Sequence, residues 1–528
     1  MRDDTHLDTS ARQDEWSEEP SARRHSYDHS DYDTQTDTRT DADDADAAGL
    51  AALHAASRNY RNHTAAPQSD RDTTPNDVTD EHTDAKRSEK DGGIKIGSVR
   101  IKTSRLFGGD KILWIIILAL LIFSMLMIFS ATAYKSGGTP FVKLINQMRY
   151  ILLGIVALLV VHFIPYKYYN QAAKWAFFIG LLLTVITMLF GRDDADARRN
   201  LSILHFSFQP FEILKIGLIM LLAQQLSHRQ KIIEHTPIMP SLNPFAWHNN
   251  PQENLKILRE QTLPILGPVI ITCIITFLSV GNSTTMIIGV TCLIILFIGR
   301  VRMADIGKMI GVAVVLVGIA YGIGIGRSST GVSRMSSFRP DMMTKHTRIT
   351  SDGIEIYDYL IVTDDGKTVP AEKDQSVHAK MSIASGRLLG KGPGMSTHRS
   401  NLEEAERDFA YAFIIEEYGA LGGLVILMLY LWLFFRTIEI GHRCQKAFPN
   451  LLVLGLGLMI VLQAMVHMLV SVSLFPITGQ QLPLISKGGS SLWFTLMALG
   501  MILGVSRSMN LEQQTVERAE AEAEQPEI

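Results

Sequence analysis

The sequence predicts an all-α, polytopic membrane protein with ten transmembrane helices, cytoplasmic N- and C-termini and one large extracytoplasmic loop. Three observations lead to this prediction. From Lys111 onward, apolar runs of about 20 residues recur, which is the length that a helix needs to cross a bilayer. Lys and Arg gather in alternate segments between these runs, as they do in cytoplasmic loops. The chain before Lys111 is polar and contains no such run.

Residues 1–93 form the first predicted region, a disordered acidic tail in the cytoplasm. They carry 23 acidic side chains against 11 basic ones, and they have too few apolar residues to offset the entropy lost on folding. They contain no apolar core of a signal peptide. Their histidines are scattered, which favours a solvated tail over a metal site. A basic juxtamembrane segment, 94–111, leads from this tail to the first helix.

The membrane domain is predicted at 112–508, and residues 509–528 form a short cytoplasmic tail. Each helix is placed on one apolar run. In the longest apolar region, the sequence Gly281–Asn282–Ser283 supplies a turn that separates two helices. The ten helices are expected at 112–133, 148–166, 173–191, 210–227, 263–281, 283–299, 305–325, 409–435, 450–475 and 488–506.

The orientation follows from five basic residues that precede the first helix and place the N-terminus in the cytoplasm. They are Lys95, Arg100, Lys102, Arg105 and Lys111. This topology puts two loops on the outer face, a short one at 192–209 and a long one at 326–408. A loop longer than about 15 residues is usually functional or disordered. Within the long loop, residues 350–375 alternate enough to predict a hairpin around Asp364–Asp365–Gly366.

The three cysteines are predicted to be packing residues. Cys273, Cys292 and Cys444 lie in or beside apolar segments and form no CxxC pair. The pattern therefore indicates no disulfide scaffold.

Charged residues inside membrane helices are costly, so each is a functional candidate. The first cluster lies in FSFQPFEILKIGLIM, where Pro210 suits the first turn of a helix. Glu212 and Lys215 are three residues apart and share one face, either as a local ion pair or as part of a site. Arg198 and Arg199 come shortly before, and two arginines can bind a phosphate group.

The second cluster occupies the stretch from Ser385 to Gly419, where a glycine-rich loop runs into an apolar helix. Asp408 lies where the two meet, and it could either cap the helix or take part in chemistry at the membrane surface. At about 100° per residue, Glu416 lies roughly 80° around the helix from Asp408, and Glu417 lies roughly opposite. At most one of these two glutamates can face the same cavity as Asp408.

The third cluster is PITGQQLPLISKGGSSLWFTL, 476–496, a polar break before the last helix. Irregular backbone at membrane depth is tolerated where it lines a cavity or is buried in protein. Lys487, Ser490 and Ser491 could offer a charge and N–H groups to an anion at the helix N-terminus, although a tight re-entrant turn is an equal alternative. The three clusters together suggest one outward-facing cavity, in a transporter, a membrane transferase or a lipid scramblase.

These clusters resemble the motifs of the SEDS family of shape, elongation, division and sporulation proteins, typified by FtsW and RodA. PITGQQLPLISKGGSS resembles the family's P-x-x-G-x-x-L-P-x-x-S-x-G-G-S-S, and ADARRNLSILHFSFQPFEILK resembles its G-A-R-R-W-I followed by F-x-F-Q-P-S-E-x-x-K. SIASGRLLGKGPGMS and LEEAERDFAYAFIIEEYG resemble its glycine loop and its aspartate-bearing helix. The resemblance covers 112–508 and implies the ten-helix topology. The combination of GKGPGMS with IIEEYG resembles the FtsW branch of Bacteroides-type bacteria, with RodA as the alternative.

The resemblance implies a peptidoglycan glycosyltransferase that polymerises lipid II. The acceptor's 4-hydroxyl attacks the anomeric carbon of the donor, undecaprenyl pyrophosphate leaves, and the configuration inverts. Asp408 matches the family's essential aspartate and is expected to act as the base, while Glu212 and Lys215 match its paired cavity residues. Lys215 is also expected to contact the pyrophosphate. The expected substrate-binding residues are Arg198, Arg199, Gln209, Glu416, Lys487, Ser490 and Ser491.

The resemblance also implies a cofactor and partners. A divalent cation, Mg²⁺ or Mn²⁺, is expected, although the sequence contains no metal motif. A class B penicillin-binding protein, similar to FtsI, and other division proteins are the expected partners at the septum of the inner membrane. No nucleic acid is expected. A lipid II flippase and a scaffold that recruits the penicillin-binding protein are the alternative functions.

Several positions depart from the family. The family's P-D-x-G-T segment is Val280–Gly281–Asn282–Ser283–Thr284 here, so a charge is lost. The tyrosine before the Gly-Gly-Ser-Ser motif is Lys487. None of the departures removes Asp408, Glu212 or Lys215.

Overall fold

The structure is a computed structural model whose described residues all fall in one of two compact units of the chain, 88–528. The described ranges are 93–96, 99–102, 108–132, 140–194, 197–203, 206–241, 243–322, 343–349, 355–362, 368–370, 375–397, 407–476 and 478–523. The predicted disordered tail, 1–93, lies outside them except for Gly93.

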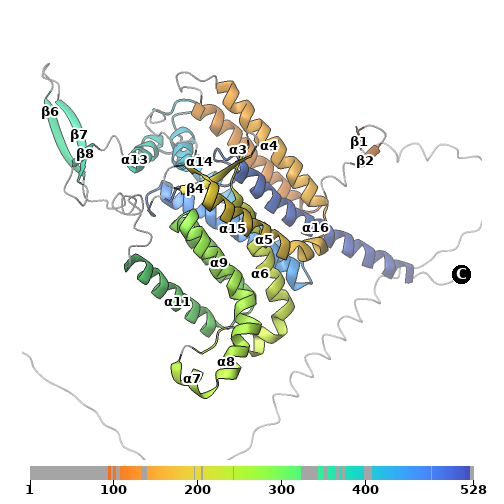
Figure 1. The fold of residues 1–528 in the computed structure, drawn as a ribbon. Coiled ribbons are helices and arrows are strands. Elements are labelled where there is room, and N and C mark those ends of the chain that lie inside the picture. The colour runs from red at the N-terminus through yellow and green to blue at the C-terminus, as the bar shows by residue number, and fades with distance from the viewer. Residues whose placement is uncertain are drawn as a thin grey trace, which may run out of the picture. The chain divides into compact units, whose positions relative to one another are not determined.

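Ten long helices follow the ten predicted apolar runs in order (Figure 1). They are α3 (Lys111–Thr132), α4 (Pro140–Phe163), α5 (Tyr166–Phe190), α6 (Pro210–His235), α9 (Leu263–Ser279), α10 (Asn282–Ile298), α11 (Met303–Gly322), α14 (Ala410–His442), α15 (Ala447–Ser471) and α16 (Ser490–Ala523). Four shorter helices in the described ranges are α7 (Pro244–Asn249), α8 (Pro251–Ile257), the π-helix η1 (Leu258–Thr262) and α13 (Gln375–Gly386). Within the described ranges, eight helical stretches are long and apolar enough to cross a membrane, and α10 is a shorter apolar helix. The multi-pass helical fold is thus confirmed, while the count of ten spans and their orientation stay predictions.

Several helix ends differ from the predicted ones. α4 begins at Pro140 instead of 148, because polar residues of its first turns find partners; Gln147 is buried and donates to Ser124 Oγ at 3.3 Å. The last helix was expected to end at 506, but α16 continues to Ala523 through Glu- and Ala-rich sequence that favours helix. The predicted turn at 280–283 is confirmed, since α9 ends at Ser279 and Gly281 has a φ of 124°.

The predicted eighth helix, 409–435, is not one continuous helix in the structure. α14 runs from Ala410 to His442, but Gly419 has φ 72° and ψ −178°, which divides it into two helices. The second piece, 420–442, is about 34 Å long at 1.5 Å per residue and could cross a bilayer alone. The first piece, 410–418, is the half-helix; its residues 410–417 are buried, and it directly follows Asp408 and Phe409.

Short strands lie between the helices. The loop 192–209 forms an antiparallel sheet of β3 (Arg192–Asp194), β4 (Ala197–Ile203) and β5 (Phe206–Phe208), which composition did not indicate. In the long loop, the predicted hairpin is confirmed as β7 (Glu355–Val362) paired with β8 (Thr368–Pro370), with Leu360 opposite Pro370. A third strand, β6 (Met343–Ile349), extends that sheet along β7. A further hairpin of β1 (Gly93–Ile96) and β2 (Val99–Lys102) lies in the basic segment before α3.

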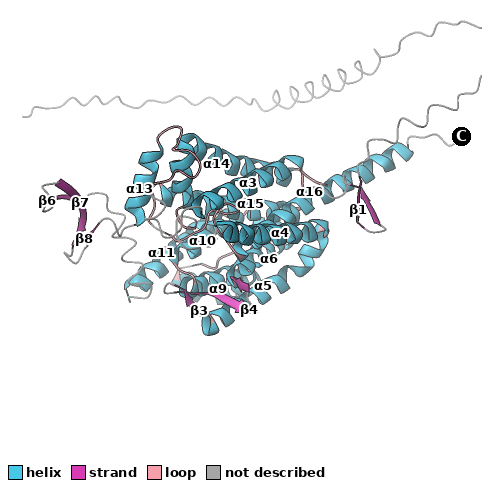
Figure 2. Cartoon of the chain, turned by 90° about the horizontal axis from the view of Figure 1, so that it is seen from above, coloured by secondary structure: helices cyan, strands magenta, loops and turns pink. Residues whose placement is uncertain are grey.

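α6 is the most enclosed of the spans that the structure describes, with 83% of its apolar window buried. It packs against α5, α15 and α9, while α14 packs against α15 and α3 (Figure 2). α11 contacts the other helices mainly at its start, where Asp305 and Ile306 are buried; residues 313–319 are exposed. The core therefore surrounds α6 and α15, and both helices carry polar residues of the site.

Candidate active site

The N-terminal end of α6 carries a buried ion pair. Gln209 is the N-cap residue and Pro210 follows in the first turn. Lys215 Nζ lies 2.8 Å from Glu212 Oε2, and the two side chains are 4% and 8% exposed. Because two charges taken out of water need close pairing and further hydrogen bonds, this pair requires polar neighbours. Lys215 supplies one contact by donating to Gln463 Oε1 of α15 at 3.3 Å.

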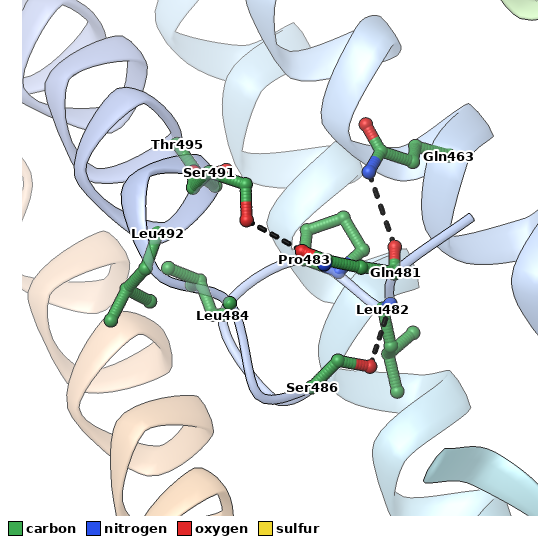
Figure 3. A pocket seen from close by; sticks show the side chains of 10 residues that line it. Gln463, Gln481, Leu482, Pro483, Leu484, Ser486, Ser491, Leu492 and Thr495 are labelled. Atoms are coloured by element: carbon green, nitrogen blue, oxygen red, sulfur yellow. Dashed lines mark hydrogen bonds between the residues drawn. The ribbon is translucent and has the colours of Figure 1, made fainter. Parts of the chain in front are cut away.

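A chain of hydrogen bonds continues from Gln463 into the break before α16 (Figure 3). Gln463 Nε2 donates to the carbonyl of Gln481 at 3.1 Å. Ser491 Oγ, in the first turn of α16, donates to Gln481 Oε1 at 2.6 Å. A small pocket is lined by Gln463, Gln481, Leu482, Pro483, Leu484, Ser486, Gly488, Ser491, Leu492 and Thr495. The first and third predicted clusters are therefore joined through Gln463, which lines the pocket.

The polar break, 478–489, is held in one conformation by its own contacts. Ser486 Oγ accepts from the amide of Leu482 at 2.9 Å. Gln480 Nε2 donates to Thr284 Oγ1 of α10 at 2.7 Å. Leu484 is buried at a φ of 67°, a conformation that is costly for a branched residue and persists only where its surroundings fix it. The break is thus an ordered pocket wall.

Asp408 lies next to this wall. Ser486 Oγ donates to the carbonyl of Arg407, the residue before Asp408, at 2.8 Å. Asp408 is partly exposed and precedes the N-cap residue of α14, Phe409, so it lies one position before the helix cap. The contact through Ser486 brings the backbone of the second cluster to the third. A cavity shared by these clusters stays a prediction.

His467 of α15 contacts both the half-helix and the polar break. Its Nε2 accepts from the amide of Tyr411 at 3.4 Å, and its Nδ1 is 2.7 Å from the carbonyl of Gln480. Since a carbonyl only accepts, Nδ1 carries the proton and the imidazole is neutral in this arrangement. His467 thus accepts from one of the first N–H groups of α14, which have no partner within the helix.

Glu416 and Glu417 lie away from the pocket residues, under the glycine loop that follows α13. Glu416 is 0% exposed and forms a 2.8 Å ion pair with Lys391. Glu417 is 1% exposed and accepts from Ser130 Oγ of α3 and from the amide of Gly394. Glu417 therefore binds a neighbouring helix, α3. Glu416, predicted to bind substrate, is enclosed by the loop.

The remaining predicted residues are distributed around the site. Gln209 donates its amide to Ser490 Oγ at 3.0 Å, which links the start of α6 to the start of α16. Lys487 is exposed, whereas Ser490 is buried. Arg198 and Arg199 both lie in β4, the middle strand of its sheet, and β4 packs against α5, α6 and α9.

The predicted site residues did not include Gln463, His467 and Gln480. Two of them are polar residues four apart in the apolar α15, and a search for uncharged polar residues in membrane helices could have found them. Among the residues that the structure describes, no group of three or more His, Cys, Asp or Glu side chains is placed to hold a metal ion.

A family model and several known proteins match most of the chain. The FtsW/RodA/SpoVE family model, described as a cell cycle protein, matches residues 110–511. A probable peptidoglycan glycosyltransferase FtsW of Neisseria gonorrhoeae is 26% identical over 402 residues, covering 75% of this chain and 83% of that protein. Stage V sporulation protein E of Bacillus subtilis is 28% identical over 412 residues, covering 77% and 99%. Peptidoglycan glycosyltransferase MrdB of Escherichia coli is 26% identical over 403 residues, covering 75% and 93%.

One solved structure has the same fold. It belongs to work on the coordination of polymerization and crosslinking by a peptidoglycan synthase complex. The TM-score is 0.54 at 20% identity, with 76% of this chain and 98% of that chain covered. At this identity the likeness concerns the fold alone.

Proposed function

The chain belongs to the FtsW/RodA/SpoVE family of cell cycle proteins, and from this premise we propose that it polymerises lipid II into glycan strands. It is a multi-pass inner membrane protein and an enzyme of the peptidoglycan glycosyltransferase class. The observation that carries the proposal is the set of hydrogen bonds that links the α6 ion pair to the polar break and the polar break to the residue before Asp408. A carboxylate beside a polar pocket suits a reaction that must remove a proton from a sugar hydroxyl.

In the proposed reaction, Asp408 takes the proton of the acceptor's 4-hydroxyl. The oxygen then attacks the donor's anomeric carbon as the bond to undecaprenyl pyrophosphate breaks, so the configuration at that carbon inverts. The half-helix 410–418 points its N-terminal end at Asp408, and the partial positive charge there favours the ionised carboxylate that a base requires. Ser486 supports this role by fixing the backbone of Arg407.

The proposed leaving-group contacts are positive or N–H-rich groups around the same region. Developing charge on the pyrophosphate is stabilised by such groups when they are preorganised. Lys215, Arg198, Arg199 and Lys487 are the proposed cations. Because Lys215 is paired with Glu212 and bound to Gln463, its proposed role includes holding the pocket wall through Gln463.

A divalent cation remains part of the proposal. The described residues do not gather three metal-binding side chains, so they do not fit a cation held by protein ligands alone. Mg²⁺ is often bound by one or two carboxylates together with substrate phosphates. Chelation of the purified protein with EDTA, followed by return of Mg²⁺ or Mn²⁺, tests the requirement; undiminished polymer after chelation would remove it.

We further propose that the protein works with a penicillin-binding protein of class B at the division septum. The fold likeness to the synthase of the polymerization and crosslinking complex supports a partner that crosslinks. The relative named FtsW supports the division role, and the relative named MrdB keeps an elongation role as the alternative. Depletion in cells separates them, because a septal enzyme leaves filaments and an elongation enzyme leaves rounded cells.

The second candidate function is lipid II transport. Transport needs polar groups through both membrane leaflets, whereas polymerisation needs one cavity and a base. Proteoliposomes that carry the protein and labelled lipid II distinguish the two. Polymer in the presence of a crosslinking-inactive partner supports the polymerase, and label transfer between leaflets without polymer supports the transporter.

A further inference from the structure

The break of α14 at Gly419 leaves backbone groups that a continuous helix would pair internally. At membrane depth an unpaired amide or carbonyl is expensive, so these groups need partners. The loop 387–397 supplies them. The amides of Lys391 and Gly392 donate to the carbonyls of Glu416 and Glu417 at 3.0 and 2.9 Å. On the other side of the break, the amides of Ala420 and Leu421 donate to the carbonyls of Arg387 and Leu388 at 2.9 and 3.3 Å.

This backbone pairing depends on close approach between the loop and the half-helix. A Cβ added at Gly386 would collide with the carbonyl of Ile415, and one at Gly390 would collide with that of Glu417. The backbones therefore approach each other closely at Gly386 and Gly390, where there is no room for a side chain.

The two glutamate carboxylates add side-chain contacts from the same half-helix. Glu416 Oε1 accepts from Lys391 Nζ at 2.8 Å and from the amide of Thr397 at 2.9 Å. Glu416 Oε2 accepts from Ser396 Oγ at 2.6 Å. Glu417 binds the loop through Gly394 and binds α3 through Ser130. Charge-assisted bonds of this kind are roughly twice as strong as neutral ones.

The other end of the half-helix is held by Tyr411. Its hydroxyl donates to the carbonyl of Gly423 at 3.1 Å, across the break, and its amide donates to His467. The half-helix is thus fixed at both ends, and Asp408 lies three residues before Tyr411.

Resting on the function proposed above, we propose that Glu416 and Glu417 are positioning residues. Their carboxylates fasten the half-helix 410–418 to the glycine loop and to α3, and so set the position of Asp408 against the pocket wall. Neither carboxylate touches the substrate, because both are enclosed by protein. This assigns Glu416 a role different from the substrate contact that its sequence position indicated.

The test uses the full-length chain in nanodiscs, with its partner added for kinetics. Glu416→Ala is expected to lower kcat about tenfold or more and to leave the KM for lipid II within about twofold. The tenfold decrease in kcat corresponds to the loss of a hydrogen bond to a charged group. Glu416→Gln is expected to recover most of kcat, because the amide can accept from Lys391 and Thr397 and donate to the Ser396 hydroxyl. A higher KM at unchanged kcat would overturn the proposal, since it indicates a substrate contact.

Amide hydrogen exchange supplies a readout that is independent of activity. In Glu416→Ala, the amides of 410–418 are expected to exchange about tenfold faster or more, while those of α15 stay unchanged. Glu439→Gln is the matched control, because Glu439 lies at the far end of α14 and pairs with Arg436 and Arg443. Unchanged exchange in 410–418 would overturn the proposal, and a wild type that makes no polymer would overturn only the proposed function.

A second variant covers the case in which Glu416→Ala does not fold. Ser396→Ala with Thr397→Val removes two donors from the loop and leaves the carboxylate in place. It is expected to accelerate exchange in 410–418 and to lower kcat in the same direction. Wild-type values for both would contradict the positioning role.

Discussion

The buried charges of Glu212 and Lys215 each depend on the other for an ionic partner. Both are nearly fully buried, so removal of one partner leaves the other as an uncompensated charge. Breaking such a pair costs about 3–5 kcal/mol, whereas replacing both charges with neutral residues of similar volume is often nearly neutral. We therefore expect Glu212→Gln and Lys215→Met each to lower the free energy of unfolding by this amount.

The double variant Glu212→Gln/Lys215→Met is the control for this prediction. It is expected to regain most of the lost stability in thermal unfolding of the detergent-solubilised protein, because no charge is left unpaired. Additive losses in the double variant would mean that the two side chains act independently, contrary to the 2.8 Å contact.

Cys444 tests the prediction that the cysteines are packing residues. It lies between α14 and α15, and burial, with a smaller contribution from Glu512, raises the pKa of its thiol from 9.0 to about 11. The thiolate, which is the reactive form, is then about 100-fold rarer at neutral pH than for a thiol of unshifted pKa. Alkylation of Cys444 by iodoacetamide, followed by peptide mass spectrometry, is expected to be slow at pH 7 and to accelerate as the pH rises towards 11. Rapid labelling at pH 7 would contradict this.

Charged residues of the site were visible in the sequence, but the uncharged polar residues of α15 were not. Asp408, Glu212 and Lys215 stand out because a charge in an apolar run is costly. Gln463 and His467 carry no such signal, and their contacts join α15 to segments far away in the chain. The enclosure of Glu416 could not be predicted for a related reason. Helical periodicity gave its direction around α14, but it could not show that a loop covers that direction.

At the scale of elements, the break in α14 decides where Asp408 lies. A continuous apolar run predicts a single helix, and the only local sign of a break is Gly419. The loop 387–397 supplies hydrogen-bond partners for the backbone groups at the break, and no local sequence pattern connects this loop to position 419. The long membrane helices could be predicted because each is defined by its own composition, whereas the half-helix is defined by tertiary contacts.

Gly419→Ala tests the importance of this break. A Cβ at position 419 would collide with the carbonyl of Leu388. The backbone there, with φ 72° and ψ −178°, lies in a region that is essentially restricted to glycine and costs a residue with a side chain about 1–3 kcal/mol before any collision. We expect a lower melting temperature and a loss of polymerisation. Gly289→Ala in α10 is the matched control, because a Cβ there meets nothing within 4 Å. It is expected to be neutral or slightly stabilising, and equal effects at both positions would contradict the account.

In the molecule as a whole, the start of the membrane domain is held in place by a contact between Asp110 and α14. Asp110 accepts from the amide of Leu113 at 2.8 Å and so caps α3. The same carboxylate lies 2.5 Å from Arg436 in the far half of α14. The family match also begins at residue 110, which separates the preceding chain from the membrane domain.

Removal of residues 1–92 is therefore expected to leave lipid II polymerisation within about twofold of wild type, since side chains outside a cooperative domain contribute little to its stability. The measurement is polymer formation by the truncated and full-length chains. As the control, Asp110→Ala in the full-length chain is expected to lower the melting temperature, because it removes a helix cap and a buried ion pair. The prediction is contradicted if the truncated chain makes no polymer while Asp110→Ala keeps the wild-type melting temperature.

Asp408 is the proposed base of a glycan polymerase. The most direct measurement is glycan formation from lipid II by the purified protein and its penicillin-binding partner, comparing wild type with Asp408→Asn, which keeps the shape and removes the charge. A general base contributes about 10²–10⁴-fold to the rate, so polymer is expected to fall by that factor while the complex stays intact on gel filtration. Polymer at the wild-type rate from Asp408→Asn would contradict the claim and assign the chemistry to another residue or to the partner.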